Sequence, residues 1–157
     1  MIRIRQITAA DWREWRALRL SALGEAPYAF RSKLTDWQGD GDVEQRWRDR
    51  LTAVPFNLIA DLDGTPAGMA SGTRDGDDAE LISMWVAPPA RGRGVADALI
   101  EAVLSWAATV HAARVVLCVL YGNDHAAAVY RRHGFVEAGC DSPQRSGEPA
   151  ERRMIRR

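Results

Sequence analysis

The spacing of apolar residues along the chain switches between the two-residue period of strands and the longer period of helices. In residues 2–6, isoleucine alternates with arginine, which predicts a half-buried first strand. Trp12, Trp15 and Leu18 then fall on one helical stripe, so we expect a first helix that ends near Gly24. The chain therefore begins with a strand followed by an amphipathic helix.

The rest of the pattern predicts a mixed α/β chain. Thr8 is expected to cap the first helix, with Asp11 in the box position. Further strands are predicted at Phe56–Leu62, Pro66–Thr73, Glu80–Ala87, Arg114–Leu120, Phe135–Ala138 and Arg152–Arg157. Further helices are predicted at about Val43–Thr52, Asp97–Ala108 and Asn123–His133. This order gives an antiparallel three-strand meander, then a strand–helix–strand crossover to a parallel strand.

Several stretches have no clear period. The segment from Glu25 to Asp42 contains Tyr28, Phe30 and Trp37, which we expect either at the rim of the core or as a wall over a substrate cleft. The predicted second helix carries three arginines that we interpret as solvated: Arg46, Arg48 and Arg50. In the strand after the Asp63–Gly64 turn, the glycines at 68 and 72 predict a bend or a close approach.

Composition narrows the class of protein. The 157 residues are expected to form a single domain over residues 1–157. Twenty-one basic and 21 acidic residues balance, so no nucleic-acid partner is implied. No apolar run has the length of a membrane span, and the N-terminus does not resemble a signal peptide, so we expect a cytoplasmic protein without a membrane partner.

Cysteines and histidines add little chemistry. Cys118 and Cys140 lack metal-ligand spacing and are interpreted as reduced, buried small side chains. The three histidines, His111, His125 and His133, receive no role, and no cluster predicts a metal site.

The segment Arg91-Gly92-Arg93-Gly94-Val95-Ala96 joins a strand to a helix. Its glycines let main-chain N–H groups approach a ligand, and the helix N-terminus and arginines add positive charge, so it predicts a phosphate or pyrophosphate site. A Walker loop is excluded because no lysine follows Gly94. A dinucleotide fingerprint is excluded because Asp97 stands at its third glycine position.

The pattern Arg91-x-x-Gly94-x-Ala96 resembles the pyrophosphate loop of the GNAT superfamily of N-acetyltransferases. A second signature of that family matches further along the chain, at Asn123, Ala126, Tyr130, Gly134 and Phe135. The resemblance covers essentially the whole chain. It implies the GNAT fold, an α/β architecture in which a mixed, mostly antiparallel central sheet is splayed in the middle and flanked by helices on both faces.

The resemblance implies that acetyl-CoA is the co-substrate. It assigns the pantetheine arm to main-chain groups of Met84, Trp85 and Val86, and the pyrophosphate to Arg91, Gly92, Arg93, Gly94, Val95 and Ala96. Asn123 is expected to cap its helix and touch the pantetheine, and Tyr130 is expected beside the sulfur. No metal is implied.

Acetyl transfer to an amine requires two proton movements. The amine must be neutral to attack, although a lysine-type amine has a pKa near 10.4. The resemblance implies that Tyr130 protonates the leaving thiolate and that Glu80 is the base, and a water chain is the alternative base. We expect a main-chain N–H near Val86 to polarise the thioester carbonyl.

The predicted function is therefore N-acetylation of a primary amine by direct attack in a ternary complex. The alternatives are a non-catalytic acyl-CoA sensor, another acyl donor, or transfer to oxygen. The acceptor is a small molecule or a protein amine, and a homodimer is left open.

Overall fold

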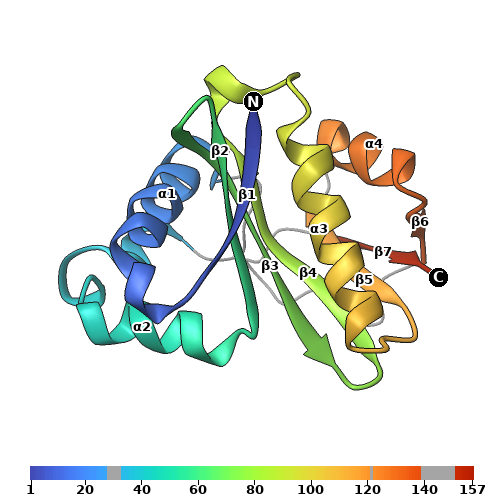
Figure 1. The fold of residues 1–157 in the computed structure, drawn as a ribbon, viewed down its shortest axis with the longest axis horizontal. Coiled ribbons are helices and arrows are strands. Elements are labelled where there is room, and N and C mark those ends of the chain that lie inside the picture. Colours follow the sequence, from blue (N-terminus) through green and yellow to red (C-terminus); the bar gives the residue numbers. More distant parts are fainter. Residues whose placement is uncertain (28–32, 121, 139–150) are drawn as a thin grey trace.

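The computed structural model describes residues 1–27, 33–120, 122–138 and 151–157. In this part of the chain a seven-stranded sheet lies between helices on both faces (Figure 1). The strands are β1 (Ile2–Ile7), β2 (Phe56–Leu62), β3 (Thr65–Asp75), β4 (Asp78–Val86), β5 (Val115–Leu120), β6 (Val136–Glu137) and β7 (Glu151–Arg156). The helices are α1 (Trp12–Glu25), α2 (Glu44–Ala53), α3 (Val95–Thr109) and α4 (Asp124–Arg132).

The sheet has the strand order β1-β2-β3-β4-β5-β7-β6. All neighbouring strands are antiparallel except β4 and β5, which are parallel. The β4–β5 ladder pairs only Ala79 with Val115 and Glu80 with Val116. Beyond these pairs the described strands separate, so the rest of β4 has an open edge toward β5. The predicted mixed, mostly antiparallel sheet with a central splay is confirmed.

Two apolar clusters hold the helices to the sheet, one on each face. One lies under α3 and α4 and includes Leu99, Val103 and Phe135, each at most 1% exposed. The other lies under α1 and α2 and includes Trp15 and Trp47. Figure 1 shows α1 and α2 on one side of the sheet and α3 and α4 on the other.

Local geometry explains how β3 fits against α3. A Cβ on Gly72 would lie 2.7 Å from the Trp106 ring, and one on Gly68 would lie 3.0 Å from the Trp85 carbonyl oxygen. The predicted close approach at both glycines is confirmed. The Trp106 ring stacks on Phe56 with centroids 5.2 Å apart, so α3 is held directly over β2 and β3.

The predicted capping residues at the start of the chain are present, but the element that they cap differs from the prediction. Thr8 and Asp11 form the predicted capping box, but the box caps a short 3-10 turn, Ala9–Asp11, and α1 follows it. The predicted antiparallel meander of β2, β3 and β4 is confirmed, and β1 adds a fourth antiparallel strand because it pairs with β2 along its whole length.

Three interpretations of single residues are wrong. Cys118 is exposed, because β5 has left β4 before it reaches this position. Arg50 is hydrogen-bonded to three side chains instead of solvated, because α2 packs that face against the sheet. Arg46 is not simply solvated either, because it donates to the main-chain carbonyls of Asp36 and Gly41. The predictions for Tyr28, Phe30 and Cys140 lie outside the described residues.

Candidate active site

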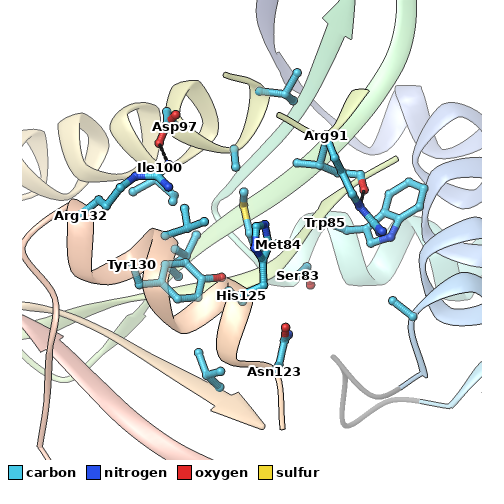
Figure 2. Close-up of a pocket in the computed structure, with 18 of the residues that line it drawn as sticks. Ser83, Met84, Trp85, Arg91, Asp97, Ile100, Asn123, His125, Tyr130 and Arg132 are labelled. Atoms are coloured by element: carbon cyan, nitrogen blue, oxygen red, sulfur yellow. Dashed lines mark hydrogen bonds and ion pairs between the residues drawn. The ribbon is translucent and has the colours of Figure 1, made fainter. Parts of the chain in front are cut away.

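A cavity of about 840 Å³ opens where β4 and β5 separate. Its wall combines β4, the segment between β4 and α3, the start of α3, part of β5 and one face of α4. Ten residues predicted for the site line it: Met84, Trp85, Val86, Arg91, Gly92, Gly94, Val95, Ala96, Asn123 and Tyr130. The fold therefore brings most of the predicted site together, and Figure 2 shows several of these side chains around one space.

The loop before α3 has the backbone of an anion site. Gly92 and Gly94 have φ values of +77° and +88°, a left-handed conformation that favours glycine. Gly94 is the N-cap of α3, and the first helical bond joins its carbonyl to the Ala98 N–H. The N–H groups of Val95 and Ala96 have no acceptor among the described residues, as expected in a first helical turn. These donors and the helix dipole favour a bound anion.

Arg91 faces away from this helix end. Its guanidinium donates to the Val86 carbonyl at 3.0 Å and to the Glu25 carboxylate at 2.7 Å. The Trp85 indole donates to the same carboxylate at 2.9 Å. Arg91, followed by Trp85, lowers the pKa of Glu25, so this carboxylate stays ionised and ties the end of α1 to β4.

The other charges near the loop come from α3 and α4. Asp97, in the first turn of α3, accepts hydrogen bonds from Arg132 at 2.9 Å and shares one with His133 at 2.7 Å. His133 is the main cause of the lowered pKa of Asp97. Arg93 does not line the cavity and lies 3.6 Å from Asp63 on the surface. Arg132, which the sequence did not single out, supplies a cation at the cavity wall.

Tyr130 lies on α4 with its ring packed edge-on against Phe135 at 5.9 Å. The residue is 8% exposed. Figure 2 shows its hydroxyl directed into the cavity. Burial raises the pKa of the phenol, so the hydroxyl remains protonated at neutral pH and is a donor. No described protein group accepts this hydrogen bond.

Glu80 does not line the cavity. It pairs with Thr73 on β3, which lies beside Gly72 and so faces away from Trp106 and α3. Glu80 therefore lies on the α1/α2 face of β4, half-buried, before the strand reaches the cavity. Its role as a base remains a prediction.

Asn123 occupies the N-cap position of α4, but its side chain makes no capping hydrogen bond. The capping part of the prediction is wrong, and the amide borders the cavity instead (Figure 2). His125 and Cys118 also border the cavity, although neither was assigned a role from the sequence. Ser83 is a further missed residue, and its positive φ of 56° has no glycine or proline signal in the sequence.

Two negative findings apply to the described residues. None of the helices in that part of the chain is long and apolar enough to cross a membrane. No group of three or more histidine, cysteine or acidic side chains within the same residues is placed to hold a metal ion.

Comparison with known proteins gives concordant matches. A family model described as the acetyltransferase (GNAT) family matches residues 7–135. A mycothiol acetyltransferase from Clavibacter sepedonicus is 31% identical over 140 residues, which is 89% of this chain and 44% of that protein. A second, from Clavibacter michiganensis, is 32% identical over 134 residues, covering 85% of this chain and 42% of that protein. The chain thus spans less than half the length of these curated relatives.

Solved structures match over nearly the whole chain. A PaiA N-acetyltransferase from Thermoplasma acidophilum, in complex with coenzyme A, has a TM-score of 0.77 at 16% identity and covers 99% of this chain and 98% of its own. A ribosomal-protein-alanine N-acetyltransferase from Brucella melitensis has a TM-score of 0.71 at 25% identity, with 98% of each chain covered.

Proposed function

Since this chain belongs to the GNAT acetyltransferase family, we propose that it transfers the acetyl group of acetyl-CoA to a primary amine by direct attack in a ternary complex. The observation that carries this proposal is the cavity at the β4–β5 separation, with the loop and N-terminus of α3 at one end. An extended ligand with a diphosphate at one end fits this arrangement.

The residues present fit coenzyme A in three respects. Left-handed glycines and unpaired N–H groups at the start of α3 suit the diphosphate. A Cβ on Gly92 would meet nothing within 4 Å, so the loop offers open space for a ligand. The open edge of β4 from Met84 to Val86 offers main-chain groups to an extended arm, as an added strand would use them.

The proposed reaction is balanced by two proton transfers. The neutral amine attacks the thioester carbon, the nitrogen–carbon bond forms, and the carbon–sulfur bond breaks. Tyr130 gives its proton to the leaving sulfur and regains one from solvent. The proton of the attacking nitrogen leaves through water or through Glu80 and a water. Tyr130 is available as the acid because its raised pKa keeps the phenol protonated at neutral pH.

The test is a turnover assay with acetyl-CoA and a panel of amines, in which released CoA is measured and products are identified by mass spectrometry. The panel contains small amines, polyamines, amine-bearing antibiotics and peptides with a lysine or a free N-terminus. The name of the two relatives adds precursors of mycothiol. Release of CoA that depends on the amine, with an acetylated product, supports the proposal. Tight binding of acetyl-CoA without turnover across the panel would instead identify an acyl-CoA sensor.

A further inference from the structure

A β-bulge interrupts the β3–β4 ladder at the cavity. Ser71 pairs with Ile82 and Met69 pairs with Trp85, so two residues of β4, Ser83 and Met84, lie opposite one residue of β3. Ser83 takes the positive φ of 56°, a conformation that costs a non-glycine residue free energy. Such a conformation persists only where the surrounding contacts hold it.

Arg50 holds Ser83 from the sheet face covered by α2. Its guanidinium donates to the Ser83 hydroxyl oxygen at 3.0 Å, to Ser71 at 3.3 Å and to Asn57 at 3.0 Å. Ser71 in turn donates to Asn57 at 2.7 Å, and the Asn57 amide donates to two main-chain carbonyls. Asn57 and Ser71 are buried, whereas Ser83 borders the cavity.

This network contains a cation and only neutral acceptors. Each side-chain oxygen that Arg50 contacts belongs to a serine or an asparagine. Burial lowers the pKa of Arg50 to about 10, which still leaves it charged at neutral pH. Because Arg50 occupies a lone pair of the Ser83 oxygen, the hydroxyl hydrogen of Ser83 is directed to another acceptor. The positive charge behind the hydroxyl makes Ser83 a stronger donor toward a developing negative charge.

The position of Ser83 along β4 matches the reacting end of the proposed ligand. The diphosphate end lies at the loop of residues 91–96, which follows the C-terminal end of β4. The thioester is at the opposite end of the pantetheine arm, so it lies further back along the strand. Ser83 is three residues back from Val86, about 10 Å at the rise of a β-strand. An arm that runs along this edge would bring the carbonyl to the bulge.

We propose that the Ser83 hydroxyl donates a hydrogen bond to the thioester oxygen of the acetyl group, and that Arg50 positions and polarises this hydroxyl. The proposal rests on the proposed acetyl-CoA-dependent function. When the amine attacks, the carbonyl electron pair moves to the oxygen, and Ser83 stabilises that oxygen without losing its own proton. The pair returns as the carbon–sulfur bond breaks, and Tyr130 protonates the sulfur.

The first test compares Ser83→Ala, Ser83→Gly and the matched control Ser71→Ala. Ser71 belongs to the same network but does not border the cavity. Loss of a donor to a reacting oxygen should lower kcat by about 10²–10³-fold, with acetyl-CoA affinity by calorimetry little changed. Ser83→Gly relieves the backbone strain and should fold while losing the same activity. Ser71→Ala should keep kcat within about threefold, because this serine does not contact the reacting oxygen. Equal losses of kcat at Ser71 and Ser83 would reduce the network to a structural role.

The second test needs no amine substrate, so it separates failure of this inference from failure of the proposed function. The carbonyl stretching frequency of bound acetyl-CoA, labelled with ¹³C at the carbonyl, is measured by infrared difference spectroscopy. A hydrogen bond from Ser83 lowers this frequency, so it should rise in Ser83→Ala and Ser83→Gly and stay at the wild-type value in Ser71→Ala. An unchanged frequency in both Ser83 variants would overturn the contact even where wild-type turnover is observed. Absence of acetyl-CoA binding to the wild type would overturn the proposed function itself.

Arg50 is tested by its conservative replacement. Arg50→Lys keeps a positive charge near Ser83, whereas Arg50→Gln removes it, so Arg50→Lys should retain more kcat and a lower carbonyl frequency than Arg50→Gln. Equal effects of the two replacements would contradict a polarising role for the charge.

Discussion

Removing only the hydroxyl of Tyr130 separates its proposed chemistry from its packing. In Tyr130→Phe the ring keeps its edge-on contact with Phe135 at 5.9 Å and its place in the cluster under α3. If the hydroxyl protonates the leaving thiolate, kcat should fall by about 10- to 10³-fold. At about 1.4 kcal/mol for each factor of ten, this corresponds to roughly 1.4–4 kcal/mol of transition-state stabilisation. Acetyl-CoA affinity should change little.

The stability of the same variant should not fall with its activity. The Tyr130 hydroxyl is directed into the cavity and has no acceptor among the described residues, so its removal breaks no hydrogen bond within that part of the chain. Tyr130→Phe should therefore be at least as stable as the wild type in urea. The matched control is Phe135→Leu, which reduces the ring contact but keeps the hydroxyl. It should lower the free energy of unfolding, by less than the roughly 3–5 kcal/mol of Phe→Ala, while most of kcat remains.

The pH dependence of stability gives an independent check on the environment of Tyr130. Its folded-state pKa is raised by burial, so the folded protein holds this proton more tightly than the unfolded chain. The contribution of this tighter proton binding to the free energy of unfolding is present below the unfolded pKa of about 10 and is lost as the pH rises above it. Wild type should lose stability above that pH more steeply than Tyr130→Phe. Full kcat in Tyr130→Phe, measured in single turnovers limited by chemistry, would refute the acid role and leave the ring as a structural element.

Three further predictions address the loop, the base and the packing. Gly94→Glu should weaken acetyl-CoA binding by about tenfold or more. Its control, Gly94→Ala, adds comparable backbone strain without charge and should weaken binding less. Equal calorimetric affinities for wild type and a folded Gly94→Glu would contradict the diphosphate placement. If Glu80 is the base, Glu80→Gln should abolish the rise of kcat/KM with pH. The profile is measured with two amines of different pKa, in wild type and in Glu80→Gln. If the rise follows the pKa of the amine in both proteins, Glu80 is not the base. Gly72→Ala should destabilise the fold by roughly 1–3 kcal/mol, because its Cβ would lie 2.7 Å from the Trp106 ring. In its control, Gly24→Ala within α1, the added methyl makes only ordinary contact at 3.6 Å. Denaturation should show the control at least as stable as the wild type, up to about 1 kcal/mol more, and equal effects of the two changes would contradict the packing argument.

The parts of the fold that depend on main-chain signals could be predicted from the sequence. The Asp63–Gly64 pair has φ values of +52° and +86°, as a tight hairpin turn requires. Pro88 and Pro89 end β4, and Gly94 begins α3 in a left-handed conformation. These residues act through their own backbones, so neighbours in sequence are enough to reveal them. The loop and the C-terminal end of β4 can be located in this way, whereas β4 begins at Asp78, ahead of the predicted start at Glu80.

Pairings between distant side chains could not be predicted in the same way. Arg91 contacts Glu25 across 66 residues, and Asp97 contacts His133 across 36. No local pattern distinguishes such an arginine from a solvated one. The same limit explains Arg50, whose contact with Ser83 spans 33 residues and joins α2 to β4. Sequence spacing can place a residue on a helix face, but it does not show which polar group that face will meet.

The bulge at Ser83 shows how a single irregularity changes the side-chain pattern of β4. Strict alternation from Leu81 would place Ser83 and Trp85 on the same face as Leu81, which packs under α3. The extra residue shifts the alternation, so Trp85 joins the cluster under α1 and reaches Glu25. The same shift brings the Ser83 hydroxyl to Arg50. A strained serine that reassigns the faces of a strand is costly for folding, and such strain is kept most often where it serves function. This cost, at the point where the sheet opens, is the physical reason to test Ser83 for a part in the chemistry.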